Sequence, residues 1–152
     1  YHHGYVPNTS YYSGWLKRSI AFWQDFLENK PIEINFHIEN LLEHDANLIS
    51  DLLEGISRQN IDICLDIGHA HILLKISVIN WIEHLKKKIG YVHLHDNHGE
   101  KDEHIGLGKG NIPLAEVLTL LKEYSPNALW ALEVNMNDMD DSILWLKENG
   151  FM

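Results

Sequence analysis

The chain has 152 residues, of which 45% are hydrophobic and 22% are charged. This composition excludes a chain too polar to fold, and the length is sufficient for one domain with a buried core. No apolar run approaches the roughly 20 residues that cross a bilayer, and the first residues do not resemble a signal peptide. We therefore expect a protein with no membrane segment.

The single cysteine, Cys64, cannot form a disulfide within the chain. A lone thiol suits a reducing compartment, so we expect a cytoplasmic protein. The formal net charge of −10 disfavours binding to nucleic acid, because like charges repel each other outside a binding site. Bound divalent cations would offset part of this charge.

Four short runs have the character of β-strands, and a segment with helical spacing follows each of them. In chain order, these runs are residues 32–38, 61–66, 89–95 and 128–133. Alternating strands and helices predict an α/β fold with a parallel sheet and right-handed crossovers. Ligands of such sheets bind at the carboxyl ends of the strands.

The predicted helices begin at residues that favour a first turn. These starts are Ser13, Asp45, Pro113, and either Asp138 or Asp140. A further helical segment near residues 76–85 completes the alternation of strands and helices.

Each predicted strand ends on a side chain that can bind a metal ion. The side chains are Glu39, Asp66, His93 or His95, and Glu133. One acid at a strand end is more often a helix cap or a loop residue, whereas four in succession favour a shared site. If the strand faces that carry them all point inward, the four groups converge. Carboxylates with imidazole suit manganese, magnesium, cobalt or zinc.

Five stretches of the sequence follow one another in a distinctive order. They are INFHIEN (34–40), CLDIGHAH (64–71), VHLHDN (92–97), DEHIGLGKG (102–110) and ALEVN (131–135). Together they resemble the xylose-isomerase-like TIM barrels, a superfamily of divalent-metal proteins. It includes endonuclease IV, of AP endonuclease family 2, and many sugar or sugar-phosphate isomerases and epimerases. The resemblance implies a (β/α)8 barrel.

The resemblance also implies which residues bind metal. The central ligands of the family are matched by Glu39, Asp66, His93 and Glu133. An additional ion of the multi-metal members is matched by His69, Asp102 and His104. In YHHG, His2 is similar to the histidine of a His-Pro-Gly motif on the preceding strand, although His3 stands where proline is usual.

Residues 91–110, YVHLHDNHGEKDEHIGLGKG, combine four histidines and four acids before a glycine-rich exit. We interpret them as a strand followed by a metal-clasping loop that brings Asp102 and His104 back to the cavity. An Asp-x-His pair places both side chains on the same side of an extended segment. For His95 and His98 we favour a supporting or solvent-exposed position.

A complete barrel of this kind typically needs about 250 residues. We therefore expect residues 1–152 to be the C-terminal portion of a single barrel domain, with about four βα units and no N-terminal strands. An open half barrel exposes two sheet edges, so we expect self-association or marginal stability.

The resemblance implies two enzyme functions. In the first, a metal ion chelates oxygens of a small sugar or sugar phosphate and stabilises an enediolate, while Glu39 and Glu133 move the proton between carbons. The alternative is zinc-dependent hydrolysis at abasic DNA sites, the one case with a nucleic-acid partner. We favour the sugar isomerase or epimerase, because three divalent ions would still leave the chain negative. A third reading is a non-catalytic fragment.

Overall fold

The computed structural model describes residues 11–41, 43–72 and 77–152. Four parallel strands form one sheet in the order β1-β2-β3-β4. The strands are β1 (Phe36–Glu39), β2 (Ile61–Asp66), β3 (Ile89–Leu94) and β4 (Leu129–Leu132). This topology confirms the predicted α/β fold with a parallel sheet in sequential order.

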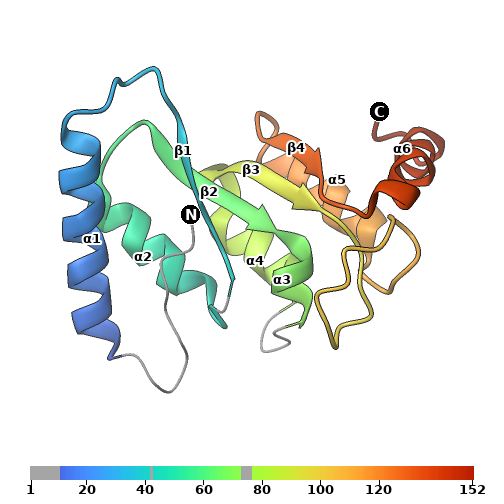
Figure 1. Ribbon diagram of the computed structural model, residues 1–152, viewed down its shortest axis with the longest axis horizontal. Coiled ribbons are helices and arrows are strands. Elements are labelled where there is room, and N and C mark those ends of the chain that lie inside the picture. Colours follow the sequence, from blue (N-terminus) through green and yellow to red (C-terminus); the bar gives the residue numbers. More distant parts are fainter. Residues whose placement is uncertain (1–10, 42, 73–76) are drawn as a thin grey trace.

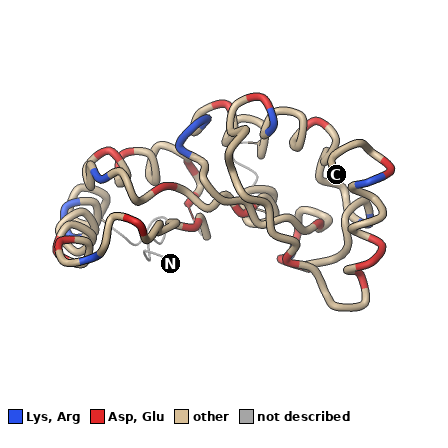
Figure 2. The backbone as a smooth tube through the Cα atoms, turned by 90° about the horizontal axis from the view of Figure 1, so that it is seen from above, with Lys and Arg blue, Asp and Glu red and all other residues tan. Residues whose placement is uncertain are grey.

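Helices precede, connect and follow the strands, and they cover one side of the sheet (Figure 1). They are α1 (Tyr12–Glu28), α2 (Ala46–Ile56), α3 (Ile67–Ile72), α4 (Val78–Leu85), α5 (Leu114–Tyr124) and α6 (Met139–Glu148), with 3-10 turns η1 (Lys86–Lys88) and η2 (Met136–Asp138). Figure 2 shows the backbone bent into an arch, with α1 at one end and α6 at the other. The open, parallel four-stranded sheet corresponds to half of a (β/α)8 barrel.

Alternation along the strands separates the core from the site. In β2, Ile63 and Leu65 are fully buried in the main core, where they pack with residues of α4 and α5 such as Trp81 and Leu118. A second cluster joins α1 and α2 to β1 through Ile38. The intervening residues of each strand point to the other face of the sheet. The polar strand residues therefore lie on the face that the helices leave open.

The first strand is shorter than predicted. It begins at Phe36 rather than at residue 32, because the preceding residues form a turn in which the amide of Ile34 donates to the carbonyl of Pro31 at 3.2 Å. The side-chain amide of Asn60 donates to the same Pro31 carbonyl and to that of Ile34. A contact from 26 residues away therefore removes this segment from the sheet.

Two helix starts also differ from the prediction. Helix α1 begins at Tyr12, after Tyr11, and Ser13 lies inside its first turn. The amide of Trp15 bonds to the Tyr11 carbonyl at 2.9 Å, and the Tyr12 ring stacks on Trp15, which stabilises the earlier start. In α5, Pro113 is the N-cap rather than the first helical residue.

The predicted cap of α2 is confirmed, since the Asp45 carboxylate accepts from the amide of Asn47 at 2.9 Å. For α6 the N-cap is Asp138, but its carboxylate makes no cap hydrogen bond. It accepts instead from the amide of Gly106 and from the Lys109 ammonium. Asp138 thus ties the glycine-rich loop to α6.

Within the described ranges, no helix is both long enough and apolar enough to cross a membrane.

Candidate metal centre

Four side chains meet at the carboxyl ends of the strands. The Nδ1 atom of His93 lies 2.9 Å from Glu133 Oε2, 3.0 Å from Glu39 Oε1 and 3.5 Å from Asp66 Oδ2. The ligand atoms of these residues all lie within 4.8 Å of one another. The strand register explains the convergence, because Asp66 pairs with His93 and His93 with Ala131, two residues before Glu133. The structure thus brings together the four side chains predicted at the strand ends.

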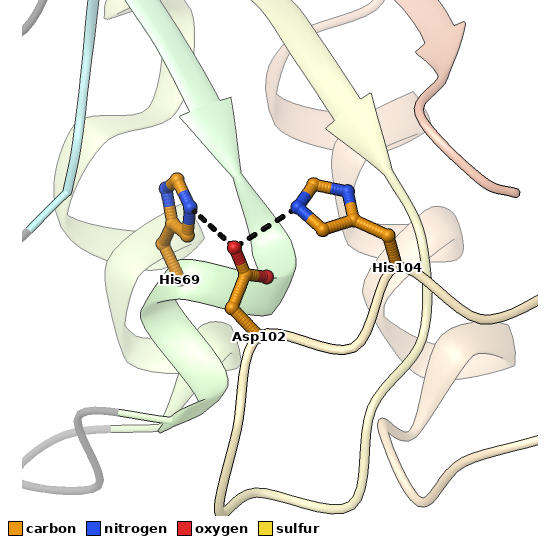
Figure 3. A group of neighbouring side chains, drawn as sticks. All are labelled: His69, Asp102 and His104. Carbon is orange, nitrogen blue, oxygen red and sulfur yellow. Dashed lines mark hydrogen bonds and ion pairs between the residues drawn. The ribbon is translucent and has the colours of Figure 1, made fainter.

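A second group is formed by His69, Asp102 and His104 (Figure 3). Both imidazoles point at one carboxylate oxygen, with Asp102 Oδ2 3.2 Å from His69 Nε2 and 2.9 Å from His104 Nε2. His69 belongs to α3, whereas Asp102 and His104 belong to the loop that follows β3. The loop therefore returns to the site as predicted, because it places Asp102 beside His69.

Backbone carbonyls orient the two imidazoles of the second group. The Nδ1 atom of His69 lies 2.8 Å from the carbonyl of Asn40, and that of His104 lies 2.8 Å from the carbonyl of Glu133. Such contacts set the tautomer and leave the Nε2 atoms directed at Asp102. His104 has φ of 50°, a left-handed conformation that is uncommon outside glycine. The loop backbone is therefore held in a specific shape around this group.

The two groups are neighbours. The His69 Nδ1 atom lies 3.9 Å from Glu39 Oε1 and 3.8 Å from Asp66 Oδ2, both in the first group. His95 lies between the groups, fully buried, with Nε2 3.0 Å from Asp66 Oδ1 and 3.7 Å from Asp102 Oδ1. His95 therefore lies inside the site, where its imidazole also forms a possible ligand group with His104 and Glu133. His98 is largely exposed and pairs with Glu103.

The carboxylates and imidazoles perturb one another strongly. Hydrogen bonds to Asp66, Cys64 and Glu39 raise the pKa of His93 to about 12. Burial by itself would raise the pKa of Asp66, but hydrogen bonds to His93 and His95 hold it far below its usual range. These shifts mean that the cluster stabilises a positive charge at its centre. A divalent cation supplies such a charge, and so does a proton on His93.

The second group has the same electrostatic character. Burial lowers the pKa values of His69 and His104, but nearby acids and backbone carbonyls outweigh it and raise both. The acids closest to these imidazoles are Asp66 and Asp102.

The donor atoms fit a hard or borderline divalent ion. Oxygen and imidazole nitrogen donors suit zinc, manganese, cobalt or magnesium. The one nearby thiol, Cys64, is buried, and burial raises its pKa, so it remains protonated and is a poor ligand. His2, predicted as a further ligand, lies outside the described residues.

Asp96 is a buried residue of the site region whose contacts were not anticipated. In the sequence it looks like an acid in a turn, but its carboxylate is fully buried among backbone amides. The signal that could have found it is the run of three glycines, Gly106, Gly108 and Gly110, shortly after it. Glycines allow a backbone to approach another group closely.

Comparison with known proteins identifies a family and relatives that are similar to this chain. The sequence model of a family described as "Xylose isomerase-like TIM barrel" matches residues 2–149. The uncharacterized protein MJ1311 of Methanocaldococcus jannaschii is 30% identical over an alignment that covers 97% of this chain and 54% of that protein. The chain spans about half the length of the curated relatives that it matches.

Solved structures resemble this chain over nearly its whole length. A D-tagatose 3-epimerase-like protein shares 30% sequence identity at a TM-score of 0.80, over 98% of this chain and 60% of that chain. The IolI protein with a bound zinc atom shares 16% identity at a TM-score of 0.73, over 95% of this chain and 58% of its own. At that identity the likeness to IolI shows the fold alone.

Proposed function

Because the chain belongs to the xylose isomerase-like TIM barrel family, we propose that the protein is a divalent-metal-dependent isomerase or epimerase of a small sugar or sugar phosphate. The observation that carries this proposal is the convergence of Glu39, Asp66, His93 and Glu133 within 4.8 Å at the carboxyl ends of the strands. The 30% identity to a D-tagatose 3-epimerase-like protein supports the substrate class. The zinc atom bound to IolI supports a divalent ion, with zinc as the first ion to test.

In this proposal the four residues hold one ion, and His69, Asp102 and His104 hold another. A bound ion supplies Lewis acidity at adjacent carbonyl and hydroxyl oxygens of the sugar. Glu39 ends β1 and Glu133 directly follows β4, and these are the two edge strands of the sheet, so the two glutamates reach the site from opposite sides. One carboxylate takes the proton from the carbon next to the carbonyl, and the other returns a proton, which moves the carbonyl or inverts the carbon.

The environments of the two glutamates differ, which supports different roles for them in proton transfer. The Glu39 side chain is 15% exposed, whereas that of Glu133 is 46% exposed. Glu133 is therefore the more accessible of the two glutamates to a sugar, while Glu39 is packed between His93 and His69. We assign the first proton transfer to Glu133.

Hydrogen exchange into the substrate tests this function directly. The whole protein, of which this chain is proposed to be a portion, is purified, loaded with zinc or manganese and incubated in D2O with D-tagatose. Deuterium should appear at the carbon next to the carbonyl, as measured by NMR. Glu133→Gln should abolish incorporation without loss of helical circular dichroism, and Glu148→Gln, at the end of α6, should match the wild type.

Absence of exchange with ketohexoses and their phosphates, in protein that carries the ion, would contradict the proposal. Full activity of Glu133→Gln would contradict the role given to that residue.

The second group favours one alternative, endonuclease IV-like hydrolysis at abasic sites, because adjacent ions can clamp a phosphate and activate water. The net charge of −10 opposes binding of DNA. Cleavage of an abasic-site oligonucleotide by the zinc-loaded protein, without sugar turnover, would select this alternative.

The proposed activity is that of the whole protein. We propose that residues 1–152 are the C-terminal portion of one barrel domain, since the residues that the structure describes form four strands, against eight in such a barrel. The edges at β1 and β4 also support our expectation of self-association for an isolated half barrel. A half barrel without catalytic activity is the outcome if the purified chain binds no ion.

A further inference from the structure

The carboxylate of Asp96 is fully buried and is surrounded by backbone amides. Its Oδ1 atom accepts from the amides of Asn97 at 2.9 Å and Ile112 at 3.1 Å. Its Oδ2 atom accepts from the amides of Gly108 at 3.1 Å and Gly110 at 3.0 Å. Four amide donors satisfy a buried carboxylate without a cation. The carboxylate of Asp96 therefore holds the exit of the loop through these four hydrogen bonds.

The backbone of Asp96 holds the middle of the same loop. Asp96 and Ile105 form an isolated antiparallel bridge, with N–O distances of 3.0 and 3.2 Å in the two directions. Ile105 directly follows His104, and Asp102 lies three residues before it. One residue thus anchors the chain immediately after the Asp102–His104 pair and again at residues 108–112.

The glycines of the exit make this arrangement sterically feasible. Gly108 has φ of +79°, a conformation that side chains rarely adopt. A Cβ atom on Gly110 would lie 2.4 Å from Asp96 Oδ1 and 2.4 Å from the carbonyl oxygen of Asn97. Only glycine allows the backbone to approach the carboxylate this closely. The glycines of DEHIGLGKG therefore allow this segment to pack its backbone against the carboxylate of Asp96.

Neighbouring contacts extend the anchor to the rest of the site. The side-chain amide of Asn97 donates to the carbonyl of Gly68 at 3.1 Å, one residue before His69. The carbonyl of Asn97 accepts from the amide of Asn111 at 3.0 Å. The two halves of the second group, His69 on α3 and the loop pair, are thereby joined through protein contacts alone.

We propose that Asp96 is a positioning residue that builds the Asp102–His104 pair in advance of any metal ion. The loop then holds two of the three residues of the second group, Asp102 and His104, in place before an ion binds. Binding of an ion there requires no ordering of the chain. The contrasting arrangement is a loop that becomes ordered only when an ion bridges His69, Asp102 and His104. The ion-binding part of this inference rests on the function proposed above, whereas the anchoring part does not.

Amide exchange in the metal-free protein separates these two arrangements. The purified protein is stripped with EDTA, and exchange of the Gly108, Gly110 and Ile112 amides is followed by NMR. We expect these amides to be protected, with little change when zinc is added. Rapid exchange that slows only on addition of zinc would overturn the proposal. This measurement uses the wild-type protein, so it does not depend on a variant that could fail to fold.

The variant Asp96→Asn tests the carboxylate itself. Asparagine has one acceptor oxygen, and its NH2 group would face amide donors, so part of the bonding set is lost. We expect exchange of the Gly108 and Gly110 amides to accelerate at least tenfold. The affinity for a second zinc ion should fall by about 10–100-fold, while the first is retained. Asp140→Asn, an exposed residue of α6, serves as the matched control.

The count of bound ions distinguishes positioning from a general structural role. If Asp96→Asn loses both ions and its melting temperature falls in proportion, the substitution has destabilised the whole fold. That result would overturn the positioning role of Asp96. Protected amides in a protein that binds no zinc would support the anchor by Asp96 and overturn only the proposed metal function.

Discussion

His95 stacks on His104, with ring centroids 4.1 Å apart and ring planes inclined by 17°. The same imidazole reaches Asp66 through Nε2, at 3.0 Å from Oδ1. One buried ring thus contacts His104 of the three-residue group and Asp66 of the four-residue group. The two groups are therefore coupled by packing as well as by proximity.

His95→Phe should separate these two contacts. Phenylalanine retains a flat ring against His104 but removes the Nε2 atom that orients Asp66. We expect zinc affinity at the four-residue group to fall by about 10–100-fold, because groups that orient a ligand have effects of this size. Competition with a coloured chelator measures this affinity. His98→Phe, at the exposed imidazole, should leave it unchanged; equal loss in both variants would contradict the role of His95.

Gly68→Ala should destabilise the protein. A Cβ atom at this position would lie 2.0 Å from Cε1 of His95, whose ring is fully buried and cannot move away freely. We expect a loss of about 1–3 kcal/mol in the free energy of unfolding, typical of overpacking. Urea unfolding monitored by circular dichroism gives this value.

Gly14→Ala in α1 is the control for that measurement, since its Cβ would meet mainly the exposed ring of Tyr11. Alanine favours helix over glycine, so this variant should be neutral or more stable. A Gly68→Ala variant as stable as the wild type would show that His95 can be displaced without cost.

The double variant Asp102→Asn with His104→Ala should remove one ion and spare the other. Both residues belong to the three-residue group, whereas Glu39, Asp66, His93 and Glu133 remain intact. Native mass spectrometry of the zinc-loaded protein counts the ions. Unchanged metal content with full activity would show that the loop pair does not bind metal.

Zinc binding should release protons at neutral pH. Hydrogen bonds to carboxylates and to Cys64 raise the pKa of His93 to about 12, so the metal-free cluster holds a proton that an ordinary histidine has lost at pH 7. A ligand imidazole must be neutral, so the ion displaces this proton. Because the pKa is raised, the affinity should increase with pH across the neutral range, by about tenfold per unit for each proton released.

Calorimetry measures that release, because the observed enthalpy then differs between two buffers that do not bind zinc and that differ in ionisation enthalpy, at the same pH. Identical enthalpies in both buffers would mean that no net proton is displaced, and that His93 is already neutral before the ion binds.

Strand periodicity, helix periodicity and the cap at Asp45 are local properties, so the amino-acid sequence alone predicted the parallel α/β order. It also placed an acid or imidazole at each strand end, and those four side chains converge because parallel strands share an edge. Alternation could not choose between His93 and His95, because it puts both on one face of the strand predicted over residues 89–95, whereas β3 ends at Leu94. The register across β1, β2 and β3 brings His93 to Glu39 and Asp66.

Other features depended on segments distant in the sequence. Asn60 closes the turn that shortens β1, and Gly68 leaves room for the ring of His95. Most clearly, Asp96 has the local signature of a solvated turn residue. It becomes a buried anchor only when the chain returns and Gly108, Gly110 and Ile112 direct their amides at its carboxylate. Hydrogen bonds between residues 12 to 16 positions apart form in the folded chain and leave no periodic pattern in the sequence.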